Sequence, residues 1–355
     1  MAFHCNATVP PNTGDQFVIP GAVKIDVAAE IERLELAGHY TKALALARQT
    51  GADLFTIARL EESVLRLGHS RLLFDENGNP RATLLRVLEL AGMDPALGVS
   101  LDLINAWVQQ NLLRIAHSER WEAQTTKFEE IEAVLKPLLA ELGFLSSVSP
   151  SFDRYEGALI LGATLPRVRS RLHNLVEAWN RGARFQDLYF LGGERLLNAE
   201  LESVHDLLSD QNNPIKIKPD WIPHPKLPCT ECEMMQMVWE QSQIPQDMRD
   251  QVRVFFTNAP MKSDLQSGKM SRPTFADTME CWLSLSPLAG SYLIVSNAPY
   301  ILRPDFIVRA IAPSEFKFDV IGSGAREHES MAIILDELAR TIFQAKQSMD
   351  KGKWR

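Results

Sequence analysis

The sequence has little cysteine and no long apolar run. Cysteine provides only 4 of the 355 residues, too few for the disulfide framework that is typical of small secreted domains. The longest apolar runs, such as 158–161 and 292–295, have the length of a strand, whereas a membrane-spanning helix needs about 18 apolar residues. Residues 1–21 also lack the charged-then-apolar order of a secretory signal. We therefore expect a cytoplasmic protein without a membrane span.

Basic charge is also scarce. Lys and Arg total 37 against 45 Asp and Glu, which gives a formal net charge of -8. A protein that binds nucleic acid usually presents a basic face, so the composition argues against a nucleic-acid partner. The length and the 45% of hydrophobic residues are sufficient for two cores and favour two domains.

The first part of the chain predicts helices. Residues 1–24 are rich in Pro, Asn, Thr and Gly, and we expect them to be irregular. Residues 25–145 carry apolar residues at helical spacing and predict a helical domain. Its helices are expected at 25–36, 40–49, 52–67, 101–115 and 118–142. The pair Asn77-Gly78 predicts a tight turn. Its surroundings do not match a calcium-binding loop, which needs Gly at the sixth position of the loop and Glu at the twelfth.

The second part of the chain predicts an α/β domain. Residues 146–157 contain Ser, Pro and Asp without periodicity and predict a linker. From 158 to 355, short apolar segments alternate with amphipathic ones. Strands are expected at 158–161, 188–191, 252–256, 292–295 and 318–321, and helices at 166–181, 230–241, 275–285, 299–310 and 327–346. This alternation is typical of a Rossmann-like α/β fold: a mostly parallel sheet of about five strands with flanking helices, here preceded by an all-α N-terminal domain.

Small polar residues follow every predicted strand. In an open parallel sheet, ligands bind at the carboxyl ends of the strands, where helix N-termini present unpaired amides. The residues at these ends are Gly162, Gly192, Gly193, Thr257, Ser296, Asn297 and Gly322. Neither a GxGxxG nor a phosphate-loop motif is present, so the cofactor is left unknown and a dinucleotide is not favoured.

Arginines near these strand ends predict an anionic ligand. Arg167 and Arg303 lie within about a turn of predicted strand ends and can hold a phosphate or carboxylate bidentately. Arg169 and Arg171 are expected on the solvated face of the same helix as Arg167. Two long excursions, 198–228 and 260–273, are candidate lids over the ligand site.

Several short segments of the α/β part resemble a known family. They are Ala158-Leu159-Ile160-Leu161-Gly162 with Arg167, Leu191-Gly192-Gly193, Thr230-Glu231-Cys232-Glu233-Met234, Asp277-Thr278-Met279-Glu280-Cys281, and Ser296-Asn297 through Arg303. In their order and placement they are similar to the YdcF/SanA/ElyC-like bacterial family, over roughly residues 158–322. The resemblance implies a Rossmann-like fold and a site for a phosphate-bearing or nucleotide-like ligand. One branch of the family is linked to S-adenosylmethionine.

The resemblance also implies site residues and shows departures. Carried over position by position, it suggests Glu231, Glu280 and Tyr300 as catalytic residues, and Thr278 among the ligand contacts. The family's histidine falls at Tyr300, so a histidine-dependent acid–base step is lost unless another group replaces it. His224, Cys229 and Cys232 give only one CxxC, short of the second pair that a structural zinc site needs, and no metal is expected.

Two functions remain open from the sequence. The first is a transferase or hydrolase acting on a small anionic ligand at the strand ends. The second is a non-catalytic interaction protein, or a secreted effector, whose helical domain engages a protein partner. Binding of nucleotides or S-adenosylmethionine, detected as thermal stabilisation, separates the two.

Overall fold

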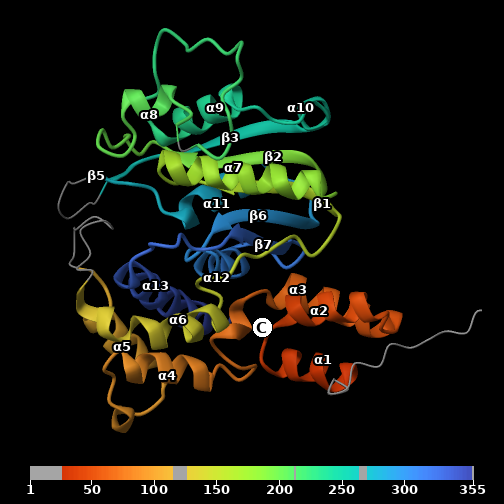
Figure 1. Ribbon diagram of the computed structural model, residues 1–355, viewed down its shortest axis with the longest axis vertical. Coiled ribbons are helices and arrows are strands. Elements are labelled where there is room, and N and C mark those ends of the chain that lie inside the picture. Colours follow the sequence, from red (N-terminus) through yellow and green to blue (C-terminus); the bar gives the residue numbers. More distant parts are fainter. Residues whose placement is uncertain (1–25, 115–125, 212, 264–269, 354–355) are drawn as a thin grey trace, which may run out of the picture.

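The protein is built on one parallel sheet. The computed structural model describes residues 26–114, 126–211, 213–263 and 270–353 (Figure 1). Five parallel strands have the order β3-β2-β1-β6-β7. They are β1 (Arg154–Leu161), β2 (Arg184–Gly193), β3 (Arg253–Ala259), β6 (Ser291–Asn297) and β7 (Lys317–Ser323). The fold is therefore a Rossmann-like α/β fold, and the predicted fold class and all five strands are confirmed.

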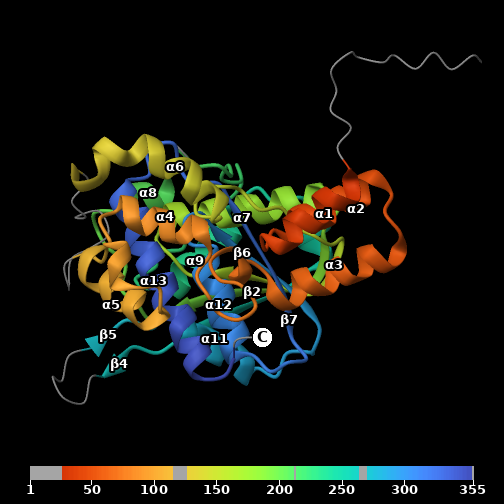
Figure 2. The same cartoon turned by 90° about the horizontal axis from the view of Figure 1, so that it is seen from below.

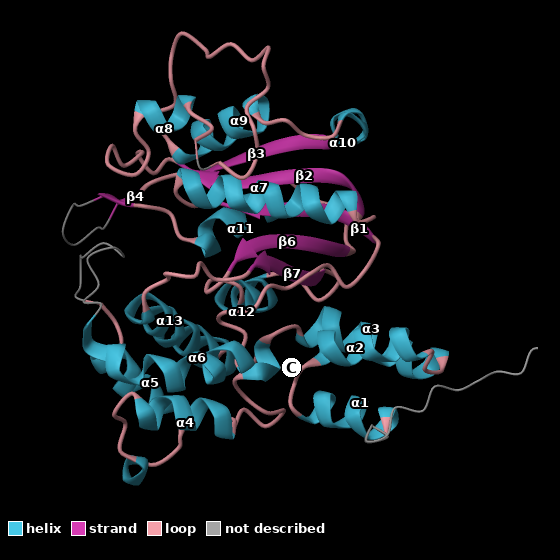
Figure 3. Ribbon diagram, in the orientation of Figure 1, coloured by secondary structure: helices cyan, strands magenta, loops and turns pink. Residues whose placement is uncertain are grey.

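Helices cover both faces of the sheet, which is why its central strands are apolar runs. One face packs against α7 (Leu165–Asn180) and α9 (Glu231–Gln241). The other packs against α11 (Phe275–Ser284), α12 (Leu302–Ile311) and α13 (Met331–Asp350) (Figure 3). Strand β6 is buried along nearly its whole length, as expected for a strand covered on both sides.

Smaller elements complete this part of the chain. The helices α8 (Val204–Leu208) and α10 (Gln246–Gln251) lie on the side of β3 and α9 (Figure 1). A two-stranded hairpin joins β4 (Lys262–Ser263) and β5 (Met270–Ser271).

The predicted linker is attached to the sheet. Strand β1 begins at Arg154, inside the range expected to be a linker. Val148 and Gly322 exchange two backbone hydrogen bonds, with N···O distances of 2.8 and 3.1 Å. The segment before β1 is therefore held against the end of β7.

The N-terminal helices fall into two groups. Helices α1 (Val27–Leu36), α2 (Tyr40–Thr50) and α3 (Leu54–Leu67) surround a small core of their own, which contains Ile31, Leu44, Leu60 and Val64. Helices α4 (Ala82–Leu90), α5 (Leu101–Asn111) and α6 (Glu132–Glu141) share one continuous core with α12, α13 and the sheet (Figure 2).

Most helical predictions in this half are confirmed, with differences at their ends. The helix expected over 118–142 is described only from 126, as a 3₁₀ turn followed by α6, and the 1–24 segment lies outside the described residues. Helix α4 was not predicted. The turn at Asn77-Gly78 is present: Asp75 Oδ1 accepts the amides of Asn77 and Asn79 at 2.9 and 2.8 Å. None of the helices in the described ranges is long and apolar enough to cross a membrane.

Candidate functional site

The strand order places the switch point between β1 and β6. From β1 the chain proceeds outward through β2 and β3, and then returns to the other side of β1 with β6 and β7. Loops that leave neighbouring strands in opposite directions open a crevice at their carboxyl ends. The segments at this point are 162–164 after β1, 298–301 after β6 and 324–330 after β7.

Helix α7 begins against a carboxylate that the chain itself supplies. Glu202 Oε1 accepts the amide of Leu165 at 3.0 Å. Arg195 donates to both carboxylate oxygens of Glu202, at 2.9 and 3.0 Å. The Glu202 side chain is fully buried, with 0% exposed. An anion is favoured at a helix N-terminus, so Glu202 occupies the position that a phosphate takes in many Rossmann-like proteins.

Glu231 lies beside this cluster. Arg195 Nε donates to Glu231 Oε1 at 3.4 Å. Burial raises the pKa of Glu231, although the neighbouring Arg195 lowers it in part. A Cβ atom on Gly162 would lie 2.8 Å from Glu231 Oε2 and 2.8 Å from the backbone carbonyl oxygen of Leu191, so glycine is needed where β1 ends. The carboxyl group is suited to carry a proton at the edge of the sheet.

Arg169 and Arg171 are not on a solvated face, and that prediction is wrong. Both are buried, with 5% and 4% exposed. Arg171 donates to the carbonyls of Leu161 and Gly162, both at 2.8 Å, and to Asn297 Oδ1 at 3.0 Å. It therefore joins the ends of β1 and β6 across the switch point.

Arg167 bridges the loops that follow β6 and β7. Its guanidinium carbon lies 4.8 Å from the centre of the Tyr300 ring. Nη2 donates to both carboxylate oxygens of Glu329, at 2.7 and 3.0 Å. The side chains of Arg167 and Glu329 are 17% and 5% exposed. Arg167 thus binds a carboxylate of the chain itself, and its role as a clamp for a ligand anion stays a prediction.

Ser296 and Asn297 shape the loop after β6. Ser296 Oγ donates to the Tyr300 carbonyl at 2.7 Å, and the Asn297 amide nitrogen donates to the Ala298 carbonyl at 3.0 Å. Both side chains are buried. Their polar groups fix the backbone of this loop, which places the Tyr300 ring against Arg167. Tyr300 is only 4% exposed.

Three other predicted site residues have their contacts elsewhere in the fold. Arg303 Nε donates to Glu337 Oε1 at 2.5 Å, between α12 and α13. Thr278 is buried and its hydroxyl donates to the Phe275 carbonyl at 3.0 Å. Glu280 is exposed on α11.

The double glycine at the end of β2 allows close packing. A Cβ atom on Gly192 would lie 2.9 Å from Cys232 Cα, and one on Gly193 would lie 2.4 Å from Pro273 Cγ. A side chain at either position would clash with these backbone and ring atoms, so packing alone requires glycine there.

The histidine and cysteines of the CxxC segment have different surroundings. His224 Nε2 is 3.2 Å from Glu240 Oε2, and Cys229 is exposed. Burial raises the pKa of the Cys232 thiol to about 11. Within the described ranges, no group of three or more His, Cys, Asp or Glu residues is placed to hold a metal ion.

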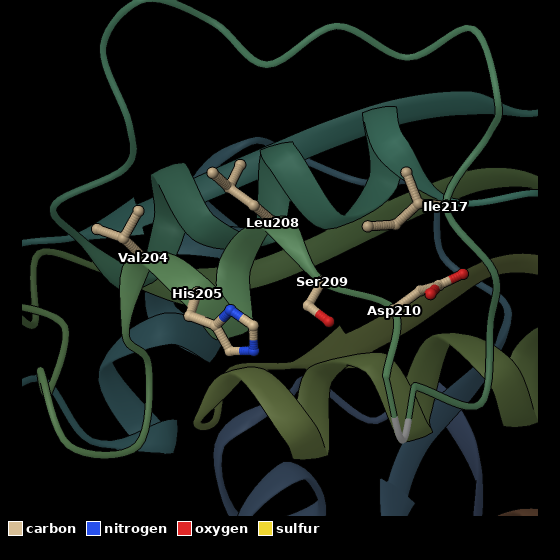
Figure 4. A pocket seen from close by; sticks show the side chains of 6 residues that line it. All are labelled: Val204, His205, Leu208, Ser209, Asp210 and Ile217. Carbon is tan, nitrogen blue, oxygen red and sulfur yellow. The ribbon is translucent and has the colours of Figure 1, made fainter.

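The 198–228 excursion carries an open pocket of about 550 Å³. Figure 4 shows its lining side chains, which come from α8 and the segment after it: Val204, His205, Leu208, Ser209, Asp210 and Ile217. None of the predicted site residues lines this pocket. The excursion reaches the switch point through Glu202 instead, a residue that no motif or spacing in the sequence singled out.

The chain was compared with family models, curated proteins and solved structures, and no match was found in any of the three. The resemblance to the YdcF/SanA/ElyC-like family is therefore supported by the short segments alone.

Proposed function

We propose that this protein binds a small anionic molecule, phosphate-bearing or nucleotide-like, in the crevice between β1 and β6. The observation that carries the proposal is the Arg167 contact. At the switch point, Nη2 of one guanidinium already donates to both oxygens of a carboxylate, and the same guanidinium lies over an aromatic ring. That geometry suits a phosphate or carboxylate equally, and a ligand anion would replace Glu329 there.

The neighbouring groups supply the chemistry for a transferase or hydrolase. Glu231 is the group suited to proton transfer, since burial raises its pKa and catalytic carboxyls are commonly tuned in this way. Tyr300 lies under Arg167 and serves to position it. The YdcF/SanA/ElyC-like resemblance supports the ligand class, and S-adenosylmethionine is a further candidate through its carboxylate.

The test is thermal stabilisation of the full chain by nucleotides, nucleotide sugars and S-adenosylmethionine. A ligand at a hundredfold excess over its Kd stabilises the folded state by about 2.7 kcal/mol. We expect Arg167→Ala to abolish the shift and Arg167→Lys to retain part of it. Arg253→Ala is the matched control, since Arg253 pairs with Asp187 at the start of β3 and is 66% exposed. Stabilisation that persists in Arg167→Ala rules the proposal out.

A second candidate function rests on the helical part of the chain. Leu54 and Phe55 begin α3 and are 84% and 78% exposed, unlike the other large apolar residues of that helix. Exposed apolar patches on soluble proteins often belong to interaction sites, so this pair is where an interaction protein or effector would contact its partner. A partner whose binding survives Leu54→Ser with Phe55→Ser excludes this surface.

A further inference from the structure

Two buried glutamates share one guanidinium beside the end of β1. Arg195 contacts both Glu202 and Glu231, and the side chains of the two glutamates are 0% and 11% exposed. Carboxylates are rarely buried without partners, because burial removes their hydration. The donors that reach each carboxyl group therefore decide which of the two carries the negative charge.

Glu202 is the ionised member of this pair. Its Oε1 accepts N–H groups of Leu165 and Arg195, both at 3.0 Å. Its Oε2 accepts N–H groups of Arg195 and Asn198, at 2.9 and 2.8 Å. An ionised carboxylate has about four acceptor sites, so these donors fill it and leave no site for a proton.

Arg195 has little left to offer Glu231. Nη1 donates to Glu202 and to the Leu196 carbonyl, and Nη2 donates to Glu202 and to the Ala163 carbonyl. These bonds occupy every N–H group of the guanidinium except that of Nε. Nε donates to Glu231 Oε1 at the long distance of 3.4 Å. Among the described residues, no other donor to the Glu231 carboxyl group is found.

The charged groups around Glu231 come from three parts of the chain. Arg195 follows β2, Glu202 belongs to the 198–228 excursion, and Arg171 lies on α7, where it donates to two backbone carbonyls. Burial raises the pKa of Glu231 and outweighs the two arginines, which lower it, while Glu202 adds to the rise. The neighbouring thiol of Cys232 is neutral as well, since burial raises its pKa to about 11.

We propose that Glu231 is a neutral carboxylic acid at neutral pH, and that Glu202 and Arg195 are the positioning residues that keep it so. Glu231 then serves as a general acid at the crevice. Its O–H bond breaks, the proton goes to an oxygen of the bound anion, and the negative charge left on Glu231 lies beside Arg195 Nε. The protonation rests on the contacts around the two glutamates, whereas the acid role rests on the function proposed for the crevice.

A general acid narrows the class of ligand. When a phosphate ester is cleaved, the P–O bond breaks, its electron pair stays on the alcohol oxygen and the Glu231 proton joins that oxygen. The phosphoryl group passes to water or to a second hydroxyl group, whose proton returns to Glu231. Methyl transfer from S-adenosylmethionine releases a neutral thioether, which needs no proton. The acid therefore favours a phosphate ester of an alcohol over S-adenosylmethionine.

Infrared difference spectra of the full chain test the protonation without any ligand. A protonated carboxyl group has a C=O stretching band that a carboxylate lacks, and subtracting the spectrum of Glu231→Gln at neutral pH should isolate one such band. Glu233→Gln is the matched control on the same helix and should remove no band, because the amides of Cys229 and Thr230 lower the pKa of Glu233. If Glu231→Gln also removes no band, the proposal is overturned.

Glu202→Gln tests the positioning role. The variant keeps the size of the side chain but removes its charge, so Arg195 loses the carboxylate that takes most of its donors. The titration midpoint of the Glu231 band should then fall by at least about one pH unit, a tenfold loss of proton affinity. Glu202→Asp keeps the charge and should leave the midpoint closer to that of the unaltered protein. A midpoint that stays unchanged in both variants contradicts the positioning role. Should Glu202→Gln fail to fold, an unfolded Glu202→Gln with a lowered midpoint in Glu202→Asp supports the role, and an unchanged midpoint in Glu202→Asp overturns it.

Ligand binding separates the acid role from the protonation. Adenosine monophosphate, a phosphate ester, should stabilise the protein more than S-adenosylmethionine does. Its Kd should change by no more than about threefold in Glu231→Gln, because no charge is removed, whereas a large gain in affinity would mean that Glu231 is ionised. Stabilisation by S-adenosylmethionine alone overturns the ligand class. If the infrared band is present and neither ligand binds, the crevice function and the acid role fail together while the protonation stands.

Discussion

Helices α7 and α2 both begin without a side-chain cap from their own N-cap residue, yet they differ in what faces their first amides. At α7 the chain provides an anion, because Glu202 reaches Leu165 and is itself neutralised by Arg195. At α2 the chain provides a lysine, an open cavity and, among the described residues, no acceptor. We call the first start closed, because a carboxylate of the protein accepts its first amide, and the second open, because no acceptor faces its first amides among the described residues.

The largest expected effect is on the free energy of unfolding when Glu202, which caps the start of α7, is removed. In Glu202→Ala the buried guanidinium of Arg195 loses its main partner, and the Leu165 amide loses its acceptor. Breaking a buried pair from one side costs about 3–5 kcal/mol, measured as the free energy of unfolding in urea. Asp187→Ala removes the partner of Arg253, whose side chain is 66% exposed and stays hydrated, and should cost less than about 1 kcal/mol. Equal losses in the two variants would show that the Glu202 cluster has no special role.

A smaller effect is expected at Glu329, whose carboxylate occupies the proposed ligand position beside Arg167. Glu329→Gln weakens the contact with Arg167, and charged hydrogen bonds contribute about 1.5–3 kcal/mol. We therefore expect an anionic ligand at the switch point to bind at least about tenfold more tightly, measured by titration calorimetry. Glu327→Gln, two residues earlier and exposed, is the control. A gain in affinity in both variants would point to overall charge instead of the Arg167 contact.

The open start should also be sensitive to acid. Burial lowers the pKa of His39 to about 4, and the charges of Lys42, Arg33 and Arg81 act in the same direction, opposed by Glu141. Between pH 6.5 and about 4 the unfolded chain binds the proton and the folded protein does not, so stability falls as the pH falls.

We expect this loss to reach about 1 kcal/mol, since the ring is only half-buried and solvent screens its neighbours. Thermal melts of the protein and of His39→Gln across this range check it. The variant should lose less stability on acidification. A pH profile identical in the two proteins would contradict the assignment.

The smallest expected effect comes from placing a carboxylate at the start of α2, where the protein has none in the first turn. Lys42→Glu places a carboxylate in the first turn of α2 and should stabilise the protein by about 0.3–1 kcal/mol through the helix dipole. Lys42→Gln, which only removes the cation, should give part of that gain. Both are measured by denaturant unfolding. A loss of stability in Lys42→Glu would mean that the start of α2 is already satisfied.

The sequence predicted the framework well because its signals are local. A strand such as β6 must be apolar on both faces, and α13 shows its stripe directly in the spacing of Met331, Ile334, Leu335 and Leu338. The pairing of charges was not predictable in this way. Glu202 and Glu329 meet Arg195 and Arg167 only after the chain has crossed the sheet, and no spacing rule connects them.

Arg171 illustrates the other limit of the sequence. Arginine is rarely buried unless it is paired, so a position on the first helix suggested a solvated face. The structure buries it because the carbonyls of Leu161 and Gly162, at the end of β1, need donors. The requirement arises from the strand, not from the helix that carries the arginine.

The core shared by α4–α6 and α13 has a consequence for synthesis on the ribosome. The Gln109 side-chain amide donates to the Ala339 carbonyl, 230 residues later, and Leu135 and Leu139 are buried in the same core as Leu338. At about 5–20 residues per second, the early helices wait roughly 10–50 s for the last helix that covers them. During that interval their apolar faces are exposed on the nascent chain, where chaperones act.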